Sequence, residues 1–475
     1  MAKEFIVAIE LGSSKVVGIA GKKNIDGSIS VLASVKEESS SYIRKGIVRN
    51  IDKTAQCISG IVRKLSTSLK TEISRVYVGV GGQSIHSERN TVQRNLEPDT
   101  IVTEGMINAL QDANLEMEYP DRKILDVAIQ EYKLDNREET DPVGMQCTRL
   151  EGNFLNILWR KTFYRNLEKC FEQAGVAIAE MYLAPLALAD SVLTDAEKRS
   201  GCVLVDLGAD TTTVSVYYKN ILRHLAVIPL GGNNITKDIA SLQMEESRAE
   251  AMKLQYGRAY TDNADIDDTQ MLDIDTDRYV KSSRFIKIVE GRLWEIIENV
   301  NYQIPDEYAK NLLGGIIITG GGANMKDIER AFRTYTKTEK VRVAKFVTHS
   351  ITAKDLNITS KNAMMNTALA LLAKGEMNCA GQPLNANGGL FDEGKPATST
   401  DGGKDTRRVS EPGRGVVLTD TEKQKIEEKK QQGGADGDTE KTPQKGEEDP
   451  QKSKDVRSVG KRIGNFFRNL LTEDE

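Results

Sequence analysis

VAIELGSSKVVGIAG (residues 7–21) and VLVDLGADTTTVSVYYKN (residues 203–220) are two versions of one pattern. Each has an apolar β-type run, an acidic residue (Glu10 or Asp206), a glycine two positions later, small or hydroxyl residues, and a second β-type run. The pattern predicts a β-hairpin whose tight turn presents backbone N–H groups to a phosphate. One copy alone is more often an ordinary surface hairpin. Two copies with their carboxylates in register predict two halves of one phosphate clamp.

Length and composition limit the classes of protein that need considering. A chain of 475 residues is too long to fold around one hydrophobic core, so two or more domains are expected. A net charge of −5 argues against a dedicated nucleic-acid binder. The five cysteines have no metal-type spacing and there are only three histidines, which argues against disulfides and zinc. The apolar run at the start is too short for a signal peptide and no run approaches a membrane span, so we expect a cytosolic protein.

Three further segments add groups suited to a nucleotide. IPLGGNNITKDIA (228–240) predicts a strand end, a glycine pair (Gly231, Gly232) and a helix whose N-terminus can face a phosphate. SRAEAMKLQYG (247–257) places Glu250 and Lys253 on one helix face. GGIIITGGGANMKDIE (314–329) predicts a buried strand, a triple-glycine turn and a helix beginning near Asn324. A glycine turn alone is more often a plain strand-to-helix corner, but five such segments in this order are strong evidence of a nucleotide site.

The order of these segments resembles the actin-like ATPase superfamily, in which two connecting helices accompany the phosphate and adenosine segments. The small-residue-rich stretches YLAPLALADSVL (182–193) and NAMMNTALALLAKG (362–375) match those helices. DVAIQEYKLDNREETDPVGMQCTRLEG (126–152) resembles a signature of the FtsA family of bacterial cell-division proteins. The resemblance implies an α/β, actin-like (ribonuclease H-like) two-lobed fold with an inserted small α/β subdomain, a disordered linker and a C-terminal amphipathic helix.

The resemblance also implies a division of the chain. The expected parts are the first part of lobe I (1–83), the inserted subdomain (84–164), the return to lobe I (165–198), lobe II with the adenosine site (199–361), the second connecting helix (362–375), the linker (376–457) and the terminal helix (458–475). The linker prediction also follows from composition, because this polar and charged stretch cannot bury enough apolar surface to offset chain entropy.

Within the terminal part, VGKRIGNFFRNLL (459–471) predicts a basic amphipathic helix suited to an anionic membrane surface. Docking back onto the globular part and binding a partner groove are the alternatives. The apolar face comprises Val459, Ile463, Phe466, Phe467, Leu470 and Leu471, and the cationic residues beside it are Lys461, Arg462 and Arg468.

The resemblance implies an ATP and Mg²⁺ site in which phosphoryl transfer to water depends on positioning and electrostatics. Glu10 and Asp206 would face the water shell of the metal, and turnover would be slow at most, since no water-activating base is evident. Lys15 is equally consistent with a solvated strand end. The phosphate residues would be Gly12, Ser13, Ser14, Lys15, Gly208, Ala209, Asp210 and Thr211, and the ribose and base residues Gly231, Gly232, Glu250, Lys253, Gly320, Gly321, Gly322 and Asn324.

The function implied is that of an actin-like adaptor at the division septum, on the cytoplasmic face of the inner membrane. Its partners would be further copies of itself in a filament, anionic lipid, the C-terminal tail of the tubulin-like protein FtsZ, and later division proteins. The FtsZ tail would dock on lobe II, where Arg292 is a candidate contact or else a solvated helix charge. A pilus or cell-shape scaffold, and a sugar kinase or chaperone-type ATPase, are the alternatives.

Overall fold

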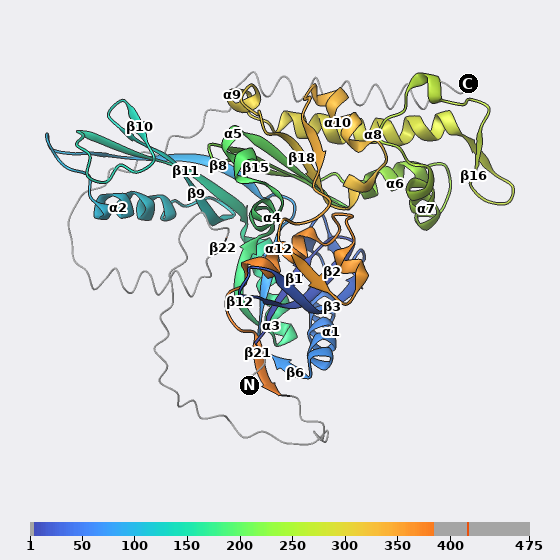
Figure 1. Cartoon of the computed structure of the whole chain (residues 1–475), viewed down its shortest axis with the longest axis horizontal. Coiled ribbons are helices and arrows are strands. Elements are labelled where there is room, and N and C mark those ends of the chain that lie inside the picture. The colour runs from blue at the N-terminus through green and yellow to red at the C-terminus, as the bar shows by residue number, and fades with distance from the viewer. Residues whose placement is uncertain (1–3, 384–415, 418–475) are drawn as a thin grey trace.

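The computed structural model describes residues 4–383 and 416–417. The predicted terminal helix and most of the predicted linker lie outside these residues. Figure 1 shows an upper bar, formed by lobe II and the inserted subdomain, and lobe I beneath its middle. No helix in the described part of the chain combines the length and apolarity needed to cross a membrane.

Lobe I is built on a seven-stranded sheet with the order β20-β3-β2-β1-β7-β12-β22. Three strands form an antiparallel meander, and β7 and β12 then add in parallel on the β1 side. Buried aliphatic residues fill β1 and β2, as expected for strands covered on both faces. The strands are β1 (Ile6–Leu11), β2 (Lys15–Lys23), β3 (Ile29–Glu38), β7 (Arg75–Val80), β12 (Ala177–Leu183), β20 (Ile351–Ala353) and β22 (Val416–Val417).

Lobe II repeats this arrangement in the same order. Its meander is β13-β14-β15, and β18 and β19 add in parallel on the β13 side. The duplicated hairpins predicted from the sequence are therefore confirmed as β1–β2 and β13–β14. The strands are β13 (Cys202–Leu207), β14 (Thr212–Tyr218), β15 (Ile221–Ile228), β18 (Gly315–Thr319) and β19 (Val341–Val343).

The inserted subdomain leaves lobe I after β7 and returns to it at α3, yet its sheet continues that of lobe II. Strand β8 pairs with β15 at His86 and Ala226, which gives one nine-stranded sheet, β10-β9-β11-β8-β15-β14-β13-β18-β19. Figure 1 shows this extension as the long arm carrying β9, β11 and α2. Its elements are β8 (His86–Asn95), α2 (Glu104–Leu115), β9 (Arg122–Leu134), β10 (Arg137–Glu139) and β11 (Arg149–Arg160).

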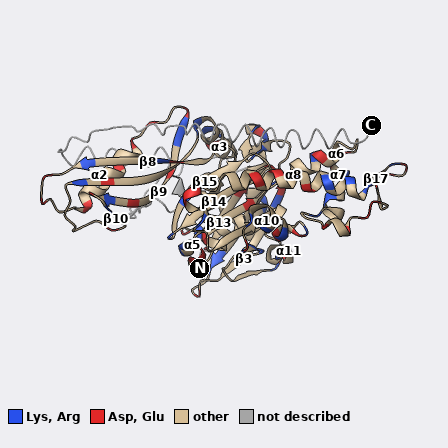
Figure 2. Ribbon diagram, turned by 90° about the horizontal axis from the view of Figure 1, so that it is seen from above, with Lys and Arg blue, Asp and Glu red and all other residues tan. Residues whose placement is uncertain are grey.

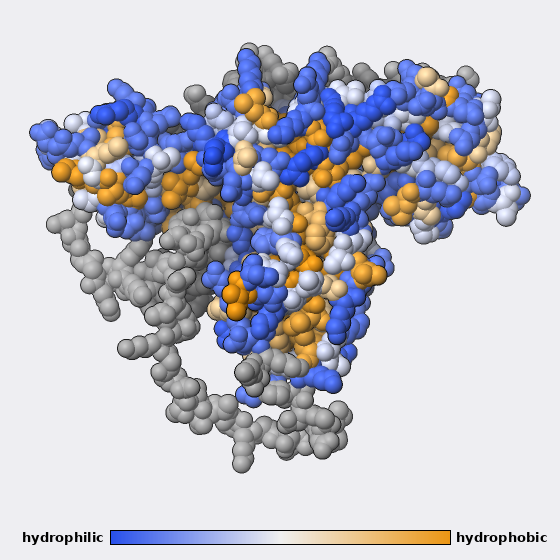
Figure 3. Space-filling model, viewed as in Figure 1, coloured by the Kyte–Doolittle hydropathy of each residue, from blue (hydrophilic) through white to orange (hydrophobic). Residues whose placement is uncertain are grey.

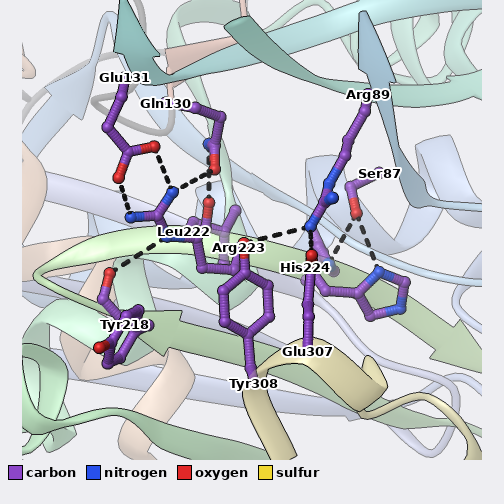
Figure 4. Close-up of polar contacts among 11 residues, drawn as sticks. Ser87, Arg89, Gln130, Glu131, Tyr218, Leu222, Arg223, His224, Glu307 and Tyr308 are labelled. Carbon is purple, nitrogen blue, oxygen red and sulfur yellow. Dashed lines mark hydrogen bonds and ion pairs between the residues drawn. The ribbon is translucent and has the colours of Figure 1, made fainter. Parts of the chain in front are cut away.

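A buried ion pair fastens the insert to lobe II. Arg223 on β15 is bound by both carboxylate oxygens of Glu131 on β9, and its Nη1 also donates to Gln130 Oε1 at 3.1 Å (Figure 4). The side chains of Arg223 and Glu131 are only 5% and 17% exposed. Beside them the Tyr308 ring lies between the guanidiniums of Arg89 and Arg223, each 5.8 Å from its centre, a cation–π arrangement. The junction thus combines this polar cluster with buried apolar residues of β9, β11 and β15 that belong to one core cluster.

Helices cover the sheets and join the lobes. In lobe I, α1 packs on β2 and β3 and also against α3, while the predicted connecting helices are α4 and α12, which pack against each other. In lobe II, α8 contacts α6 and α10. The helices are α1 (Ile51–Leu69), α3 (Lys161–Ala174), α4 (Ala184–Val192), α5 (Asp195–Ser200), α6 (Gly232–Ala240), α7 (Glu246–Tyr256), α8 (Ser282–Tyr302), α9 (Asp306–Ala309), α10 (Ile328–Thr336), α11 (Leu356–Thr359) and α12 (Asn366–Lys374).

Two predicted boundaries differ from the structure. The helix expected near Asn324 is a short 3₁₀ turn, η2 (Gly321–Asn324), and α10 begins only after Asp327, whose φ of +61° interrupts the helical path. Residues 380–383, expected to belong to the disordered linker, form β21 (Ala380–Pro383) paired with β6 (Thr71–Ile73). The remaining short elements are β4 (Ile43–Arg44), β5 (Ile47–Val48), η1 (Asn263–Asp265), β16 (Met271–Asp273) and β17 (Tyr279–Lys281).

Candidate functional site

The two predicted phosphate turns have the same hydrogen-bonded geometry. The Gly12 N–H donates to Lys15 O at 3.0 Å, and the Gly208 N–H donates to Thr211 O at 2.9 Å. A Cβ on either glycine would lie within 2.8 Å of the carbonyl oxygen that its own N–H binds. Any larger residue would therefore distort the turn.

Both turns open into one cavity of about 1260 Å³ between the lobes. Figure 3 shows a largely hydrophilic face with hydrophobic residues gathered where the lobes meet. Of the nucleotide residues predicted from the sequence, those that line this cavity are Glu10, Gly12, Ser13, Ser14, Lys15, Asp206, Gly208, Ala209, Thr211, Gly231, Gly232, Glu250, Lys253, Gly320, Gly321, Gly322 and Asn324.

Asp210 is the one predicted phosphate residue that does not line the cavity. Its Oδ2 accepts the backbone N–H of Lys45 in lobe I at 3.0 Å, and its Oδ1 accepts from Asn233 Nδ2 at 2.7 Å. Asp210 therefore joins the two lobes, whereas its neighbours Ala209 and Thr211 line the cavity.

Glu10 and Asp206 lie at the ends of β1 and β13, on the cavity wall. Burial raises the pKa of Glu10 to about 7, with the Asp206 carboxylate raising it further and Lys15 opposing the shift. Burial likewise raises the pKa of Asp206 to about 6. Among the described residues, Glu10 Oε2 is buried with no hydrogen-bond partner. Within the described part of the chain, this oxygen of Glu10 thus has no donor from the protein itself.

Lys15 lines the cavity and is not a fully solvated strand end. Its Nζ donates to Met364 O at 3.1 Å, in the segment that precedes α12. Burial lowers the pKa of Lys15, and the nearby Glu10 carboxylate opposes that shift. The ammonium and the two carboxylates therefore share one partly desolvated cleft.

Glu250 and Lys253, the pair predicted to bind the ribose, also line the cavity. Lys253 Nζ bonds Glu250 Oε2 at 2.7 Å, Thr236 Oγ1 at 2.8 Å and Gly232 O at 3.0 Å, which ties α7 to the start of α6. Asn324, which lines the same cavity, donates to Gly321 O at 3.1 Å and to Asn362 O at 2.7 Å, linking the glycine turn to the segment before α12.

The sequence reasoning missed several residues that line the same cavity. The hairpin glycine Gly46 donates its N–H to Ser13 Oγ at 2.8 Å, and a Cβ on it would lie 2.5 Å from Gly82 Cα. The Gly81-Gly82 pair directly after β7 was the available signal, since it repeats the strand-then-glycine pattern of the other segments. The further lining residues that were not predicted include Gly79, Ala184, Pro185, Thr213, Asn233, Arg258, Lys326 and Asn362.

Arg292, predicted as a partner contact, is already engaged within lobe II. On α8 it forms two bonds with the Asp238 carboxylate of α6 and one with Glu295. Its side chain is 18% exposed. Figure 2 shows basic and acidic residues interspersed around α6, α7 and α8.

Comparison with known proteins places this geometry in a family. The model of the SHS2 domain inserted in FtsA matches residues 82–158, and that of cell division protein FtsA matches residues 203–370. Cell division protein FtsA of Porphyromonas gingivalis is 32% identical over 68% of this chain and 69% of its own length. The chain belongs to the FtsA family. The FtsA of Neisseria meningitidis is 31% identical over 69% of this chain and 80% of its own.

A solved structure agrees with the FtsA assignment at the level of fold. The PilM–PilN type IV pilus biogenesis complex contains a chain that superposes with a TM-score of 0.53. The alignment covers 77% of this chain and 97% of that one at 14% identity. The actin-like α/β fold that the family resemblance implied is therefore confirmed.

Proposed function

We propose that this protein binds ATP with Mg²⁺ in the cleft between its lobes, as the nucleotide-dependent part of a cell-division adaptor. The observation that carries the proposal is the pairing of two turns with the same hydrogen bond, β1–β2 and β13–β14, around one cavity with a carboxylate behind each. Backbone donors in such turns suit phosphate oxygens. The cavity, about 1260 Å³, has ample room for a nucleoside triphosphate.

The residues present fit magnesium bound through water. Glu10 has an unpartnered Oε2, and burial raises the pKa values of both Glu10 and Asp206. A cation and its water shell would stabilise the charged form of these two carboxylates. Among the described residues no cluster of three or more His, Cys, Asp or Glu side chains could hold a metal. The cation would therefore rely on the phosphates as well, and would neutralise their charge.

The glycine surfaces fit a flat nucleoside. A Cβ on Gly231 would lie 2.6 Å from Ala209 O, and one on Gly320 would lie 2.3 Å from Asp206 Oδ1, so no larger residue fits at these two positions of the wall without displacing its neighbours. Gly321 faces open space. Glu250 and Lys253 would bond the ribose and neighbouring groups.

A nucleotide titration tests this site. Asp206→Ala is expected to weaken Mg²⁺-dependent binding of a fluorescent ATP analogue by at least about tenfold, about 1.4 kcal/mol. The matched control is Asp195→Ala, on the short surface helix α5 outside the cavity. Undiminished affinity in the Asp206 variant would show that the clamp is assigned to the wrong residues.

We further propose that ATP-bound copies assemble into a filament held at the cytoplasmic face of the inner membrane by residues 459–471. Membership of the FtsA family and the amphipathic sequence support this step. Each basic residue contributes only about 1 kcal/mol at an anionic surface, so one helix binds weakly and several linked copies bind well. The filament would tether FtsZ through its C-terminal tail and recruit later division proteins at the septum.

Co-sedimentation with anionic liposomes, with and without Mg-ATP, tests the membrane step. The shortened chain should end after Pro383, because residues 380–383 pair with β6 and an earlier cut would remove that strand. Only the full chain is expected to pellet, more strongly with Mg-ATP, and Phe466→Glu with Phe467→Glu should release it while leaving nucleotide affinity unchanged. If neither chain pellets, residues 459–471 serve a protein partner.

The FtsZ contact needs a separate test, because Arg292 is already paired. Binding of an FtsZ tail peptide is expected on lobe II near α8, and Arg292→Ala tests whether this arginine takes part. An unchanged affinity would place the contact elsewhere on lobe II, whereas a loss of affinity with lobe II still folded would keep Arg292 as a contact.

A further inference from the structure

The sheet of lobe I ends in a strand contributed from far along the chain. β12 pairs on one side with β7, in parallel, and on the other with Val416–Val417 (β22), antiparallel, with Tyr182 opposite Val416 and Met181 opposite Val417. β22 also contacts β9 of the insert. Figure 1 shows β22 beside β12, beneath the arm that carries β9.

The sequence around β22 differs from the rest of the chain that follows residue 383. Val416, Val417 and Leu418 form the only run of three consecutive aliphatic residues between positions 384 and 457. β-branched residues favour strands, and the glycine and proline that precede the run at positions 412–415 are typical strand boundaries. The composition and the observed pairing therefore select the same residues independently.

We infer that the segment between the actin-like body and the terminal helix is an intramolecular ligand of lobe I, which adds a strand to the edge of β12 through Val416–Val417. An edge strand presents a row of N–H and C=O groups that an extended segment can pair with. A pairing this short is weak, but covalent attachment supplies an effective concentration on the order of millimolar. The occupant is thus a segment of the same copy.

Chain length permits this attachment. The chain leaves lobe I at β21, and roughly 32 residues (384–415) separate Pro383 from Val416, enough to reach about 110 Å when fully extended. Both ends of that stretch lie on lobe I, at β6 and β12, so no partner molecule is needed to close the loop.

The attachment would shorten the tether of the terminal helix, a consequence that rests on the proposed membrane function. Counted from Pro383, roughly 74 residues (384–457) precede the helix and reach about 260 Å at most. Counted from β22, roughly 40 residues (418–457) remain and reach about 140 Å. Docking therefore sets how far from the membrane the body of the protein can stand, and fixes the point from which the tether leaves it.

Hydrogen exchange of the amides in β12 tests the attachment in solution, without lipid or nucleotide. Proline removes the donor N–H, so Val416→Pro with Val417→Pro should break the pairing. We expect exchange at the amides of Met181 and Tyr182, the two residues that pair with β22, to rise at least about tenfold in this variant and in the chain ending at Pro383. The matched control, Val409→Pro with Ser410→Pro, should exchange like the unaltered chain.

The results separate the possible failures. Equal exchange of β12 in the unaltered chain and in the Val416/Val417 variant would overturn the inference, and so would full protection in the chain that ends at Pro383. Protection that increases with protein concentration would overturn the intramolecular arrangement and indicate exchange of the strand between copies. Because nucleotide and membrane are absent, none of these results depends on the proposed function.

Discussion

Replacing Glu10 by Gln is expected to stabilise the nucleotide-free protein while impairing its binding of Mg-ATP. Glu10 lies in a partly buried cleft, its Oε2 has no hydrogen-bond partner among the described residues, and its pKa is raised from 4.5 to about 7. Folding therefore favours the protonated carboxyl and disfavours the charged one. Gln keeps the shape of the side chain and removes the charge.

The size and the pH dependence of this effect follow from linkage. When a group has a higher pKa in the folded state than in the unfolded state, the protein becomes less stable as the pH rises from the unfolded-state pKa to the folded-state pKa. At about 1.36 kcal/mol for each pH unit, a rise from 4.5 to about 7 corresponds to about 3 kcal/mol. Glu10→Gln should thus be no more stable than the parent protein near pH 4, and about 3 kcal/mol more stable above pH 7.

Urea denaturation of the nucleotide-free proteins across this pH range measures the difference. The control is Glu72→Gln on the exposed face of β6, which should change stability by no more than about 0.5 kcal/mol at any pH. A Glu10→Gln variant less stable than the parent at pH 8 would refute the reasoning, because it would mean that the folded protein stabilises the charged form. Titration with Mg-ATP should show weaker binding by the same variant.

Two further predictions concern the walls of the cleft and the insert junction. Gly320→Ala should lower the free energy of unfolding by about 1–3 kcal/mol, because Gly320 has φ of +86° and an added Cβ would meet Asp206 Oδ1. Gly321 faces open space, so Gly321→Ala should change stability by under about 0.5 kcal/mol. Equal stabilities of the two variants in urea denaturation would contradict this. Arg223→Met should cost about 3–5 kcal/mol by leaving Glu131 without its partner, and adding Glu131→Leu should recover most of the loss. Arg223 holds the pKa of Glu131 low, so the parent protein should lose the stability that the ion pair provides as the pH falls, and the double variant should not. A double variant as unstable as the single one would argue against a coupled pair.

The sequence was sufficient for the fold and for most of the cleft because the relevant signals are local. The two β-runs around Glu10 and around Asp206 predict a hairpin each, and the glycine positions of those hairpins follow from the close approach of carbonyl oxygens within four residues. A duplicated local motif leaves few ways to build one site. The predicted clamp residues therefore line one cavity, with Asp210 as the exception.

Two of the missed features depend on contacts between segments that are distant in the chain, and one depends on a local backbone angle. Asp210 has the sequence context of a phosphate residue, but its carboxylate accepts the N–H of Lys45, a pairing that no local pattern reveals. Helix α10 begins later than predicted because Asp327 adopts a positive φ. Aspartate tolerates this conformation, and the sequence pattern does not reveal it. The strand at 380–383 was missed because composition predicts disorder over a window and does not resolve four residues that an exposed edge can recruit.

The insert poses a mechanical constraint that follows from its two attachments. The chain passes from lobe I into the insert near Gln83 and returns to lobe I near Trp159. These two crossings lie side by side, because Trp159 Nε1 donates to Gln83 O at 3.1 Å. Its sheet and its buried ion pair, Arg223 with Glu131, belong to lobe II. A change in the angle between the lobes cannot move the insert with both of them. Either the crossings near Gln83 and Trp159 bend, or the junction at Arg223 opens, and opening that junction exposes a buried charge pair at a cost of several kcal/mol. Bending at the crossings leaves this charge pair buried, so we expect the insert to follow lobe II in any change of the angle between the lobes.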